Sequence, residues 1–419
     1  MNDNAQEQLS SEIAATFGKG IWSDASNGAN LVLRVCDVQR PSPNDRLSVT
    51  KMSKHRTIET EGDGLKSYAA ICIALLLGRR PICLIDEPEL CLHPPQAYSL
   101  GAFIGEHGAS EETATYVATH SSQILRGIIQ SNSKVDIIRL TRRCGAFSAR
   151  RIPSQQLVTA LKKPTLRAES VLDGIFSDSV IIVEADSDRL VYQTTLETLK
   201  GEISLSVHFS TSGGAGGISD ICAFYRQLGI PVAVIADLDV ITDDAVFKKI
   251  VHPLTDEDSS VSLVDLARKI TCEIMKLTPA VQPEDYKRQL QNILTLGANW
   301  ENGDDLKIKK CLRELSNRLD RGRKIKNGGI NTLPEHIAKS LAELLDALKK
   351  IGLFLVPVGE LEDWLASENI GASKENKQAW ANAAAFAIQS KGPSPTDIWD
   401  FMRGVSHNLR KILDDGNEV

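Results

Sequence analysis

Two short apolar runs that each end in carboxylates constrain the fold of this chain more than any other feature. Val180–Val183 is followed by Glu184, and Val232–Ala236 is followed by Asp237 and Asp239. Runs of four or five apolar, largely β-branched residues are typical of strands that are buried on both faces of a parallel sheet. A further strand pattern, Leu205–Phe209, lies between these two runs and is separated from each of them by a helical pattern. The order of elements therefore predicts a β-α-β-α-β unit with right-handed crossovers.

The carboxylates behind these runs predict a metal site. The carboxyl ends of parallel strands meet at one edge of a sheet, where α/β proteins bind ligands. In extended backbone Asp237 and Asp239 would point to the same side, and Glu360 and Glu362 follow a third apolar run, Leu353–Val358. Each acid alone also fits a first-turn residue that complements a helix dipole. Three acidic groups behind three strands favour Mg²⁺ or Mn²⁺ instead, and two such ions about 3.5–4 Å apart can promote phosphodiester hydrolysis.

A further apolar run, Ile82–Ile85, ends in Asp86 and Glu87. At a nucleotide site Asp86 would hold Mg²⁺ and Glu87 would polarise the water that attacks a γ-phosphate. A lone run of this kind is also compatible with an edge strand that ends in a solvated acidic turn. The neighbouring motifs decide between these two interpretations.

Three neighbouring motifs favour the nucleotide site. Gly62, Asp63 and Gly64 open an apolar helix, where free backbone N–H groups can face phosphate. Leu92-His93-Pro94 follows the acidic pair, and His120 follows the next strand. In this order the set resembles the second half of an ABC-type ATPase head, as in the SMC, RecF and OLD families, with signature glycines, Walker B, D-loop and switch histidine. The resemblance implies ATP as a ligand of the complete site.

The phosphate-gripping sequence GxxxxGK[ST] does not occur in the chain. Gly18-Lys19 is followed by Gly20, and Lys66-Ser67 is preceded by Leu65. Without that loop no lysine reaches the β-phosphate, so we do not expect this chain alone to hydrolyse ATP. We expect a separate chain, or a missing N-terminal part of a longer protein, to carry the loop. Because ABC heads work face to face, we also expect a homodimer.

The strand-borne Glu184, the glycine-containing turn and the DxD pair resemble a Toprim domain. Glu184-x-x-x-Asp188-Arg189 and the late Glu360-x-Glu362 look most like the OLD (overcoming lysogenisation defect) type, in an order that covers about residues 60–400. The resemblance implies a set of metal ligands: Glu184, Asp188, Asp237, Asp239, Glu360 and Glu362.

The same resemblance implies further catalytic roles. Glu184 would take part in proton transfer. A basic residue after the last acidic motif would stabilise charge on the phosphate, and Lys391 is the first candidate, with Arg403 second. Both basic residues also fit plain solvated charges. The loop Ser212–Gly217 lacks the lysine that the family often has there, which leaves backbone N–H groups as its phosphate contacts.

The resemblance predicts a metal-dependent DNA endonuclease coupled to an ABC-type ATPase head, in phage defence or DNA repair. The alternative is a non-catalytic ABC/SMC-like DNA-binding subunit that needs a partner chain for ATP. A topoisomerase or primase ranks lower, because the chain has no recognisable context for either chemistry. The formal charge of −6 excludes a strongly basic nucleic-acid coat. The basic stretch Arg139–Lys163 could still follow a DNA backbone or form a charged surface linker.

The fold class predicted is α/β, with a partial ABC-type ATPase lobe followed by a Toprim parallel-sheet domain that carries a helical insertion. The expected parts are a lobe over 1–140, a connector over 141–177, a Toprim domain over 178–372 with the insertion at about 243–350, and a C-terminal helical segment over 373–419.

The longest apolar run, Tyr68–Gly78, is shorter than the roughly 20 residues that span a bilayer. The eight cysteines form no CxxC pair. We therefore expect a cytoplasmic protein with no membrane partner and no zinc site.

Overall fold

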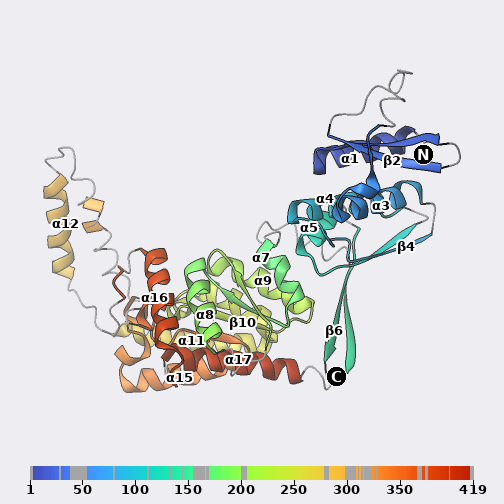
Figure 1. Cartoon of the computed structure of the whole chain (residues 1–419). Helices are drawn as coiled ribbons and strands as arrows, with labels where there is room; N and C mark the ends of the chain where they lie inside the picture. The colour runs from blue at the N-terminus through green and yellow to red at the C-terminus, as the bar shows by residue number, and fades with distance from the viewer. Residues whose placement is uncertain are drawn as a thin grey trace. The chain divides into compact units, whose positions relative to one another are not determined.

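The computed structural model of the chain, drawn in Figure 1, divides into two compact units, Met1–Phe176 and Ser177–Val419. Each unit is described by itself. The residues that the structure describes are 3–27, 30–37, 54–78, 81–110, 113–131, 134–143, 145–153, 166, 169–199, 205–277, 283–297, 308–309, 311–312, 315, 323–326, 328–365, 370–372, 376–395 and 397–415.

The first unit contains a small antiparallel sheet, a helical layer and a pair of parallel strands. The antiparallel sheet has the order β1-β2-β3, and β4 pairs with β5 in parallel. A single apolar core unites the helices with both sheets. The elements are α1 (Asp3–Phe17), β1 (Gly20–Asn27), β2 (Asn30–Cys36), β3 (Arg56–Thr57), η1 (Ile58–Thr60), α3 (Asp63–Leu77), β4 (Ile82–Asp86), α4 (Pro94–His107), β5 (Ala114–Ala118) and α5 (Ser122–Ser131).

The first unit ends in an antiparallel hairpin, β6 (Ile137–Arg143) and β7 (Ala146–Ile152), followed by α7 (Glu169–Asp173) and η3 (Gly174–Phe176). Figure 1 shows the two strands extending from the rest of their unit as a ribbon. Much of the expected connector at 141–177 is therefore regular structure. Residues 154–165, which include the basic Lys162 and Lys163, lie outside the described residues.

The second unit is built on a four-stranded parallel sheet with the order β11-β10-β8-β9. Its strands are β8 (Ser179–Val183), β9 (Val207–Thr211), β10 (Val232–Ala236) and β11 (Leu353–Leu355). Every residue of β8, β10 and β11 is buried, as the continuous apolar runs predict. The predicted α/β class with a parallel sheet is thus confirmed.

Helices cover both faces of this sheet. Alternate strand residues such as Ile181, Ala233 and Phe354 share one core with α8 (Asp186–Thr198), α16 (Lys377–Lys391) and α17 (Asp397–Asp415). On the other face α9 (Ala215–Gln227) contacts β8 and β10. Trp380 and Trp399 are fully buried in the first of these layers, as expected for core residues.

A helical insertion separates β10 from β11, as the polar pattern predicts. Its described elements are η4 (Leu238–Thr242), α10 (Asp244–Val251), η5 (His252–Leu254), α11 (Glu257–Lys276), α12 (Pro283–Gly297), α14 (Arg323–Lys326), η6 (Gly329–Thr332) and α15 (Glu335–Lys350). Within the described ranges, no helix combines the length and the apolar character that crossing a membrane requires.

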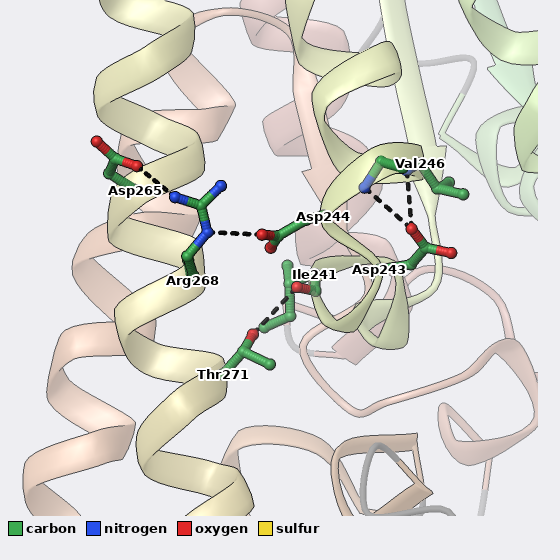
Figure 2. Close-up of polar contacts among 8 residues, drawn as sticks. Ile241, Asp243, Asp244, Val246, Asp265, Arg268 and Thr271 are labelled. Atoms are coloured by element: carbon green, nitrogen blue, oxygen red, sulfur yellow. Dashed lines mark hydrogen bonds and ion pairs between the residues drawn. The ribbon is translucent and has the colours of Figure 1, made fainter.

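Polar contacts attach the first helices of the insertion to the turn behind β10 (Figure 2). The Asp243 carboxylate accepts hydrogen bonds from the first backbone N–H groups of α10. The buried Thr271 hydroxyl donates to the Ile241 carbonyl at 3.0 Å, and Arg268 bridges Asp244 and Asp265. As a result α11 is fixed against η4, the turn that carries Asp239.

Candidate functional site

The acids of the second unit lie at the carboxyl edge of its sheet. Glu184 follows β8 directly, and Asp237 follows β10 directly. Glu360 lies five residues beyond the end of β11, after a turn. Since β10 pairs with both β8 and β11, the three strand ends are neighbours.

The turn before Glu360 is tied to the turn after β10. The Leu238 N–H donates to the Gly359 carbonyl at 3.0 Å. Gly359 has a φ of +113°, and a Cβ there would lie 2.1 Å from the Lys326 carbonyl oxygen. Only glycine allows this close approach, which places α14 directly against the acidic edge.

Lys326 lies among three of the predicted metal ligands. Its Nζ is 3.6 Å from Asp237 Oδ2, 3.2 Å from Asp239 Oδ2 and 3.9 Å from Glu360 Oε2. All four side chains are partly buried, so these ion pairs are shielded from solvent on several sides. Sequence reasoning missed Lys326, because a lysine in a polar insertion gives no signal of its tertiary neighbours.

The backbone of the DxD pair differs from the expectation. Asp239 lies inside the 3₁₀ turn η4, whereas an extended segment was predicted. Asp237 itself has an extended conformation. The turn forms because residues 238–242 leave the sheet toward the insertion. Both carboxylates still reach Lys326, so the turn, and not strand alternation, brings them together.

Burial and like charge perturb the acids at this edge. Burial, together with Asp188 and Asp239, raises the pKa of Glu184 above its ordinary value. Burial raises the pKa of Asp237 to about 7, although the ammonium of Lys326 acts in the opposite direction. Burial favours the neutral form of Lys326 and acts to lower its pKa. The carboxylates of Asp239 and Asp237 act in the opposite direction and outweigh burial, so the pKa of Lys326 is raised. A cluster of titratable groups perturbed in this way is typical of a functional site.

Asp188 has both a capping role and a place near the other acids. Its Oδ2 accepts a hydrogen bond from the Ala185 N–H at 2.9 Å, which caps the start of α8. Burial raises its pKa, and Glu362 contributes in the same direction. Asp186, which opens α8, is exposed and pairs with Arg189.

Glu362 is the most buried of the predicted ligands, with a side chain only 4% exposed. Lys377 Nζ lies 4.0 Å from Glu362 Oε1. The positive charge of Lys377 also acts against the raised pKa values of Glu184 and Asp188, although burial outweighs it. Lys377 is thus a second basic residue at this edge that sequence reasoning missed. Lys391 lies at the end of α16, with its Nζ 6.0 Å from the centre of the Trp399 ring.

The glycine loop lies beside Glu184. The Gly214 N–H donates to the Glu184 carbonyl at 3.1 Å, and the Ser212 hydroxyl donates to the Val183 carbonyl at 3.1 Å. Gly214 has a φ of +123°, a conformation that glycine adopts at little cost. The loop is therefore held against the end of β8.

The donor atoms of these side chains are all carboxylate oxygens, which are the ligands that hard divalent cations such as Mg²⁺ prefer. Within the described residues, no three His, Cys, Asp or Glu side chains lie close enough together to hold one ion as they stand. The ammonium of Lys326 stands in for such an ion, since it is the cation that Asp237, Asp239 and Glu360 surround. Asp237, Asp239 and Glu360 carry the oxygen donors that a divalent ion at this edge would need.

In the first unit the predicted switch histidine and the acidic strand end are close together. His120 Nδ1 lies 3.7 Å from Glu87 Oε1 and 3.2 Å from Glu89 Oε1. Glu87 has a φ of +43°, which is uncommon for a residue other than glycine and directs the chain sharply away from β4 and Asp86. Glu89 also accepts hydrogen bonds from the Thr119 hydroxyl and the His120 N–H, and sequence reasoning missed it.

The predicted signature glycines lie beside the turn that follows β4. Gly62 precedes α3, and Asp63, its first residue, pairs with Lys66 at 3.0 Å. A Cβ on Gly64 would lie 2.4 Å from the Cys91 carbonyl oxygen, so glycine is required for this packing. The beginning of α3 thus lies close to the segment between β4 and α4.

Comparisons with known proteins agree with the architecture of the second unit. The family model "Overcoming lysogenization defect protein-like, TOPRIM domain" matches residues 175–239, and the predicted resemblance is confirmed for this segment. Endonuclease GajA of Bacillus cereus (strain VD045) is 22% identical over 187 residues, which are 43% of this chain and 31% of GajA. The chain therefore matches about a third of the length of this curated relative.

One solved structure, from a study of ATP-driven dimerization and DNA-stimulated activation of SMC ATPases, matches with 15% identity and a TM-score of 0.26. The match covers 38% of this chain and 89% of that chain.

Proposed function

We propose that this chain is a metal-dependent DNA endonuclease whose catalytic centre is the carboxyl edge of the second sheet. The observation that supports this most directly is the convergence of Asp237, Asp239 and Glu360 on one cation, the ammonium of Lys326. The match of residues 175–239 to an OLD-like TOPRIM domain and the similarity to endonuclease GajA support the reaction class.

The proposed metal ligands are the six predicted acids, and the ions are Mg²⁺ or Mn²⁺. When bound, two such ions would supply Lewis-acid stabilisation and an activated water. Six carboxylates crowded at one edge need positive charge, and Lys326 and Lys377 supply part of it in this state. The ligands are Glu184, Asp188, Asp237, Asp239, Glu360 and Glu362.

The residues of the chain itself have further roles in this proposal. Glu184 is the proton acceptor, because its raised pKa makes it a stronger base than an exposed glutamate. Lys391 remains the proposed partner for charge on the phosphate. The backbone of the glycine loop, held beside Glu184, orients the scissile phosphate through its N–H groups.

For the first unit we propose half of an ABC-type ATP site. Asp86 would hold Mg²⁺, Glu87 would orient the attacking water and His120 would contact the γ-phosphate, as their arrangement at the neighbouring ends of β4 and β5 suggests. Gly62, Asp63 and Gly64 would face a nucleotide whose phosphate-gripping loop is on a separate chain or a missing N-terminal part. The proposed assembly is a homodimer, in the setting of phage defence or DNA repair.

Nicking of supercoiled plasmid tests the nuclease. We expect the wild-type chain to nick plasmid in Mg²⁺ or Mn²⁺ and not in EDTA. Asp237→Asn should abolish nicking, because Asn removes the charge that would hold the ion. Asp346→Asn is the matched control, since Asp346 is exposed and pairs only with Lys349 one helical turn away among the ion pairs described. Nicking by the Asp237 variant at the wild-type rate would refute the proposed site.

A specific observation favours the second candidate, a non-catalytic DNA-binding subunit. Lys326 already places one positive charge among three of the carboxylates, which is how a site that has lost its metal could be stabilised. Under this alternative the chain binds DNA equally well with and without divalent ions and cleaves it under neither condition. The plasmid assay and a binding assay in EDTA separate the two candidates.

A further inference from the structure

A hydrogen bond between two aromatic side chains links the acidic segments that follow β8 and β11. Trp364 Nε1 donates to the Tyr192 hydroxyl at 3.2 Å, across 172 positions of the chain. Tyr192 lies on α8, four residues after Asp188. Trp364 directly follows η7 (Leu361–Asp363), two residues after Glu362. The bond therefore connects the two short segments that carry these proposed metal ligands.

Asp188 and Glu362 lie close enough for their charges to interact. Burial is the largest cause of the raised pKa of Asp188, and the negative charge of Glu362 acts in the same direction. Lys377, whose Nζ is 4.0 Å from Glu362 Oε1, acts on the pKa of Asp188 in the opposite direction. Residues four apart share one face of a helix, so Tyr192 lies on the face of α8 that carries Asp188.

The two aromatic side chains are held in place by the core of the second unit. The Tyr192 side chain is only 1% exposed. The ring of Phe401, on α17, lies 6.0 Å from the centre of the Tyr192 ring and 5.2 Å from that of Trp364. All three belong to the apolar layer that α8, α16 and α17 form with the sheet. Close packing of this kind leaves the pair little freedom, so the bond fixes α8 relative to η7.

The Tyr192 hydroxyl also has a proton to donate. Among the hydrogen bonds of the described residues, the one from Trp364 uses this hydroxyl as an acceptor, and none uses its proton. Burial raises the pKa of Tyr192, and the charges of Asp188, Asp237 and Glu362 act in the same direction, so the proton is retained. A buried donor without an acceptor is costly. A carboxylate that turns to bind a metal ion, or a water molecule on that ion, would supply the acceptor.

We propose that the hydrogen-bonded pair of Tyr192 and Trp364 positions Asp188 and Glu362 for a divalent ion. Tyr192 is then a positioning residue behind the ligands and not a ligand itself. The inference rests on the proposed function, because it concerns the metal site of the proposed nuclease. Hydrogen bonds behind metal ligands orient them, and their loss typically lowers metal affinity by about 10- to 100-fold.

Binding of Mn²⁺ alone tests the inference, because it needs neither DNA nor cleavage. The full chain is titrated with Mn²⁺ at pH 8, and electron paramagnetic resonance of the free ion gives the affinity. Tyr192→Phe keeps the ring and its packing and removes the hydroxyl, and we expect it to weaken Mn²⁺ binding by about tenfold or more. Trp364→Phe removes the donor of the same bond and should weaken binding by a similar factor.

The double variant separates positioning from general loss of packing. If the bond between the two side chains is what matters, Tyr192→Phe/Trp364→Phe should weaken Mn²⁺ binding no more than either single variant does, because both changes remove the same interaction. Two side chains that merely fill the core would give independent losses, whose factors multiply.

Thr198→Val is the matched control. Trp399 Nε1 donates to Thr198 Oγ1 at 2.9 Å, so a hydroxyl of α8 binds a tryptophan there as well. Thr198 is the last residue of α8, ten positions beyond Asp188. The control should lower the midpoint of urea unfolding and leave the Mn²⁺ affinity unchanged. Circular dichroism confirms folding, and Trp364→Phe alone decides the test if Tyr192→Phe unfolds.

The inference is overturned if either single variant binds Mn²⁺ with the wild-type affinity, or if Thr198→Val loses as much as they do. Losses that multiply in the double variant overturn it as well. In each case the aromatic pair supports the core and not the metal site.

These outcomes are distinct from a failure of the proposed function. A wild-type chain that binds no Mn²⁺ refutes the proposed metal site, and the inference with it. Wild-type binding that both single variants retain refutes the inference alone. Mn²⁺ binding that depends on the pair, in a wild-type chain that does not nick plasmid, supports the inference and refutes only the nuclease.

Discussion

At the scale of single residues, the carboxyl edge of the second sheet holds buried carboxylates whose ionisation costs stability. Glu184, Asp188 and Asp237 each have a raised pKa, for which burial is the largest cause. Charges held in such an environment cost folding free energy unless a counterion offsets them. Lys326 and Lys377 offset part of this cost. This balance of charges should affect both the pH dependence of stability and the affinity for metal ions.

Replacing Asp237 by Asn should stabilise the protein increasingly as the pH rises. The folded pKa of Asp237 is about 7, against about 3.8 unfolded, so the folded state binds more protons between pH 4 and 7. Its contribution to stability is therefore lost as the pH rises through this window. Asn cannot ionise, so the variant should keep this stability at high pH. Its free energy of unfolding should exceed that of the wild type by about 1–3 kcal/mol at pH 8 and by much less at pH 5.

Thermal unfolding of both proteins at pH 5 and pH 8 measures this difference. Asp346→Asn, an exposed acid, should change stability by no more than about 0.5 kcal/mol at either pH. A difference between wild type and the Asp237 variant that does not change with pH would contradict the raised pKa.

Replacing Lys326 by Met should strengthen Mn²⁺ binding by about tenfold or more at pH 8. The ammonium competes with the metal for Asp237, Asp239 and Glu360, and an attraction of about 4 kcal/mol is expected for one such pair at 4 Å near a protein surface. Electron paramagnetic resonance of free Mn²⁺ measures the affinity without reference to activity. Lys349→Met, at an exposed ion pair, is the control. Weaker binding by the Lys326 variant would show that this lysine supports the metal site.

At the scale of elements, turns and short helices decide how the acids meet. The turn η4 carries Asp239, and α11 supports it through the hydrogen bond from Thr271 to Ile241. The backbone of α14 lies against Gly359, which positions Lys326. Elements of the insertion thus shape the edge that the strands provide.

Replacing Thr271 by Val should destabilise the second unit by about 1–3 kcal/mol. Valine matches threonine in shape, but it leaves the buried Ile241 carbonyl without its donor. Arg268 is on the same helix, and Arg268→Gln removes its exposed ion pairs with Asp265 of α11 and Asp244 of α10. This change should cost less than about 1 kcal/mol. Urea unfolding measures both values, and equal losses would mean that the buried hydrogen bond is not what fixes η4.

At the scale of the whole molecule, the chain consists of two units with separate cores and distinct proposed ligands. In the first unit, the parallel pair β4–β5 exposes Leu84, 77%, and Tyr116, 58%, to solvent. Parallel strands are usually covered on both faces. This exposed face is compatible with the proposal that another polypeptide segment completes the nucleotide site.

Calorimetry should resolve two unfolding transitions, one for each unit. Mn²⁺ should raise the midpoint temperature of the transition that belongs to the second unit and leave the other unchanged. A ligand that binds only the folded state, at a free concentration 100 times its dissociation constant, adds about 2.7 kcal/mol to the free energy of unfolding. Asp237→Asn should abolish this shift. MgATP should leave the first unit unchanged, because the phosphate-gripping loop is absent from the sequence. A clear stabilisation by MgATP would refute the proposed half-site.

Sequence reasoning succeeded where a local pattern carries the information. The runs Val180–Val183 and Val232–Ala236 are strands of a parallel sheet because continuous apolar residues suit burial on both faces. The β6–β7 hairpin was missed because arginines occupy both of its faces and hide the alternation of a strand. Glu89 was missed because its partners, Thr119 and His120, lie some thirty residues away.

The sequence by itself determined β8 and β10, the helical insertion and the acids that directly follow these two strands, because these depend on side-chain periodicity and on residues adjacent in the chain. Only the tertiary structure decided which charges face those acids. Lys326 is separated from Asp239 by 87 positions, yet their charged atoms are 3.2 Å apart. Such a contact depends on how the insertion folds back onto the sheet, and no local pattern encodes that path.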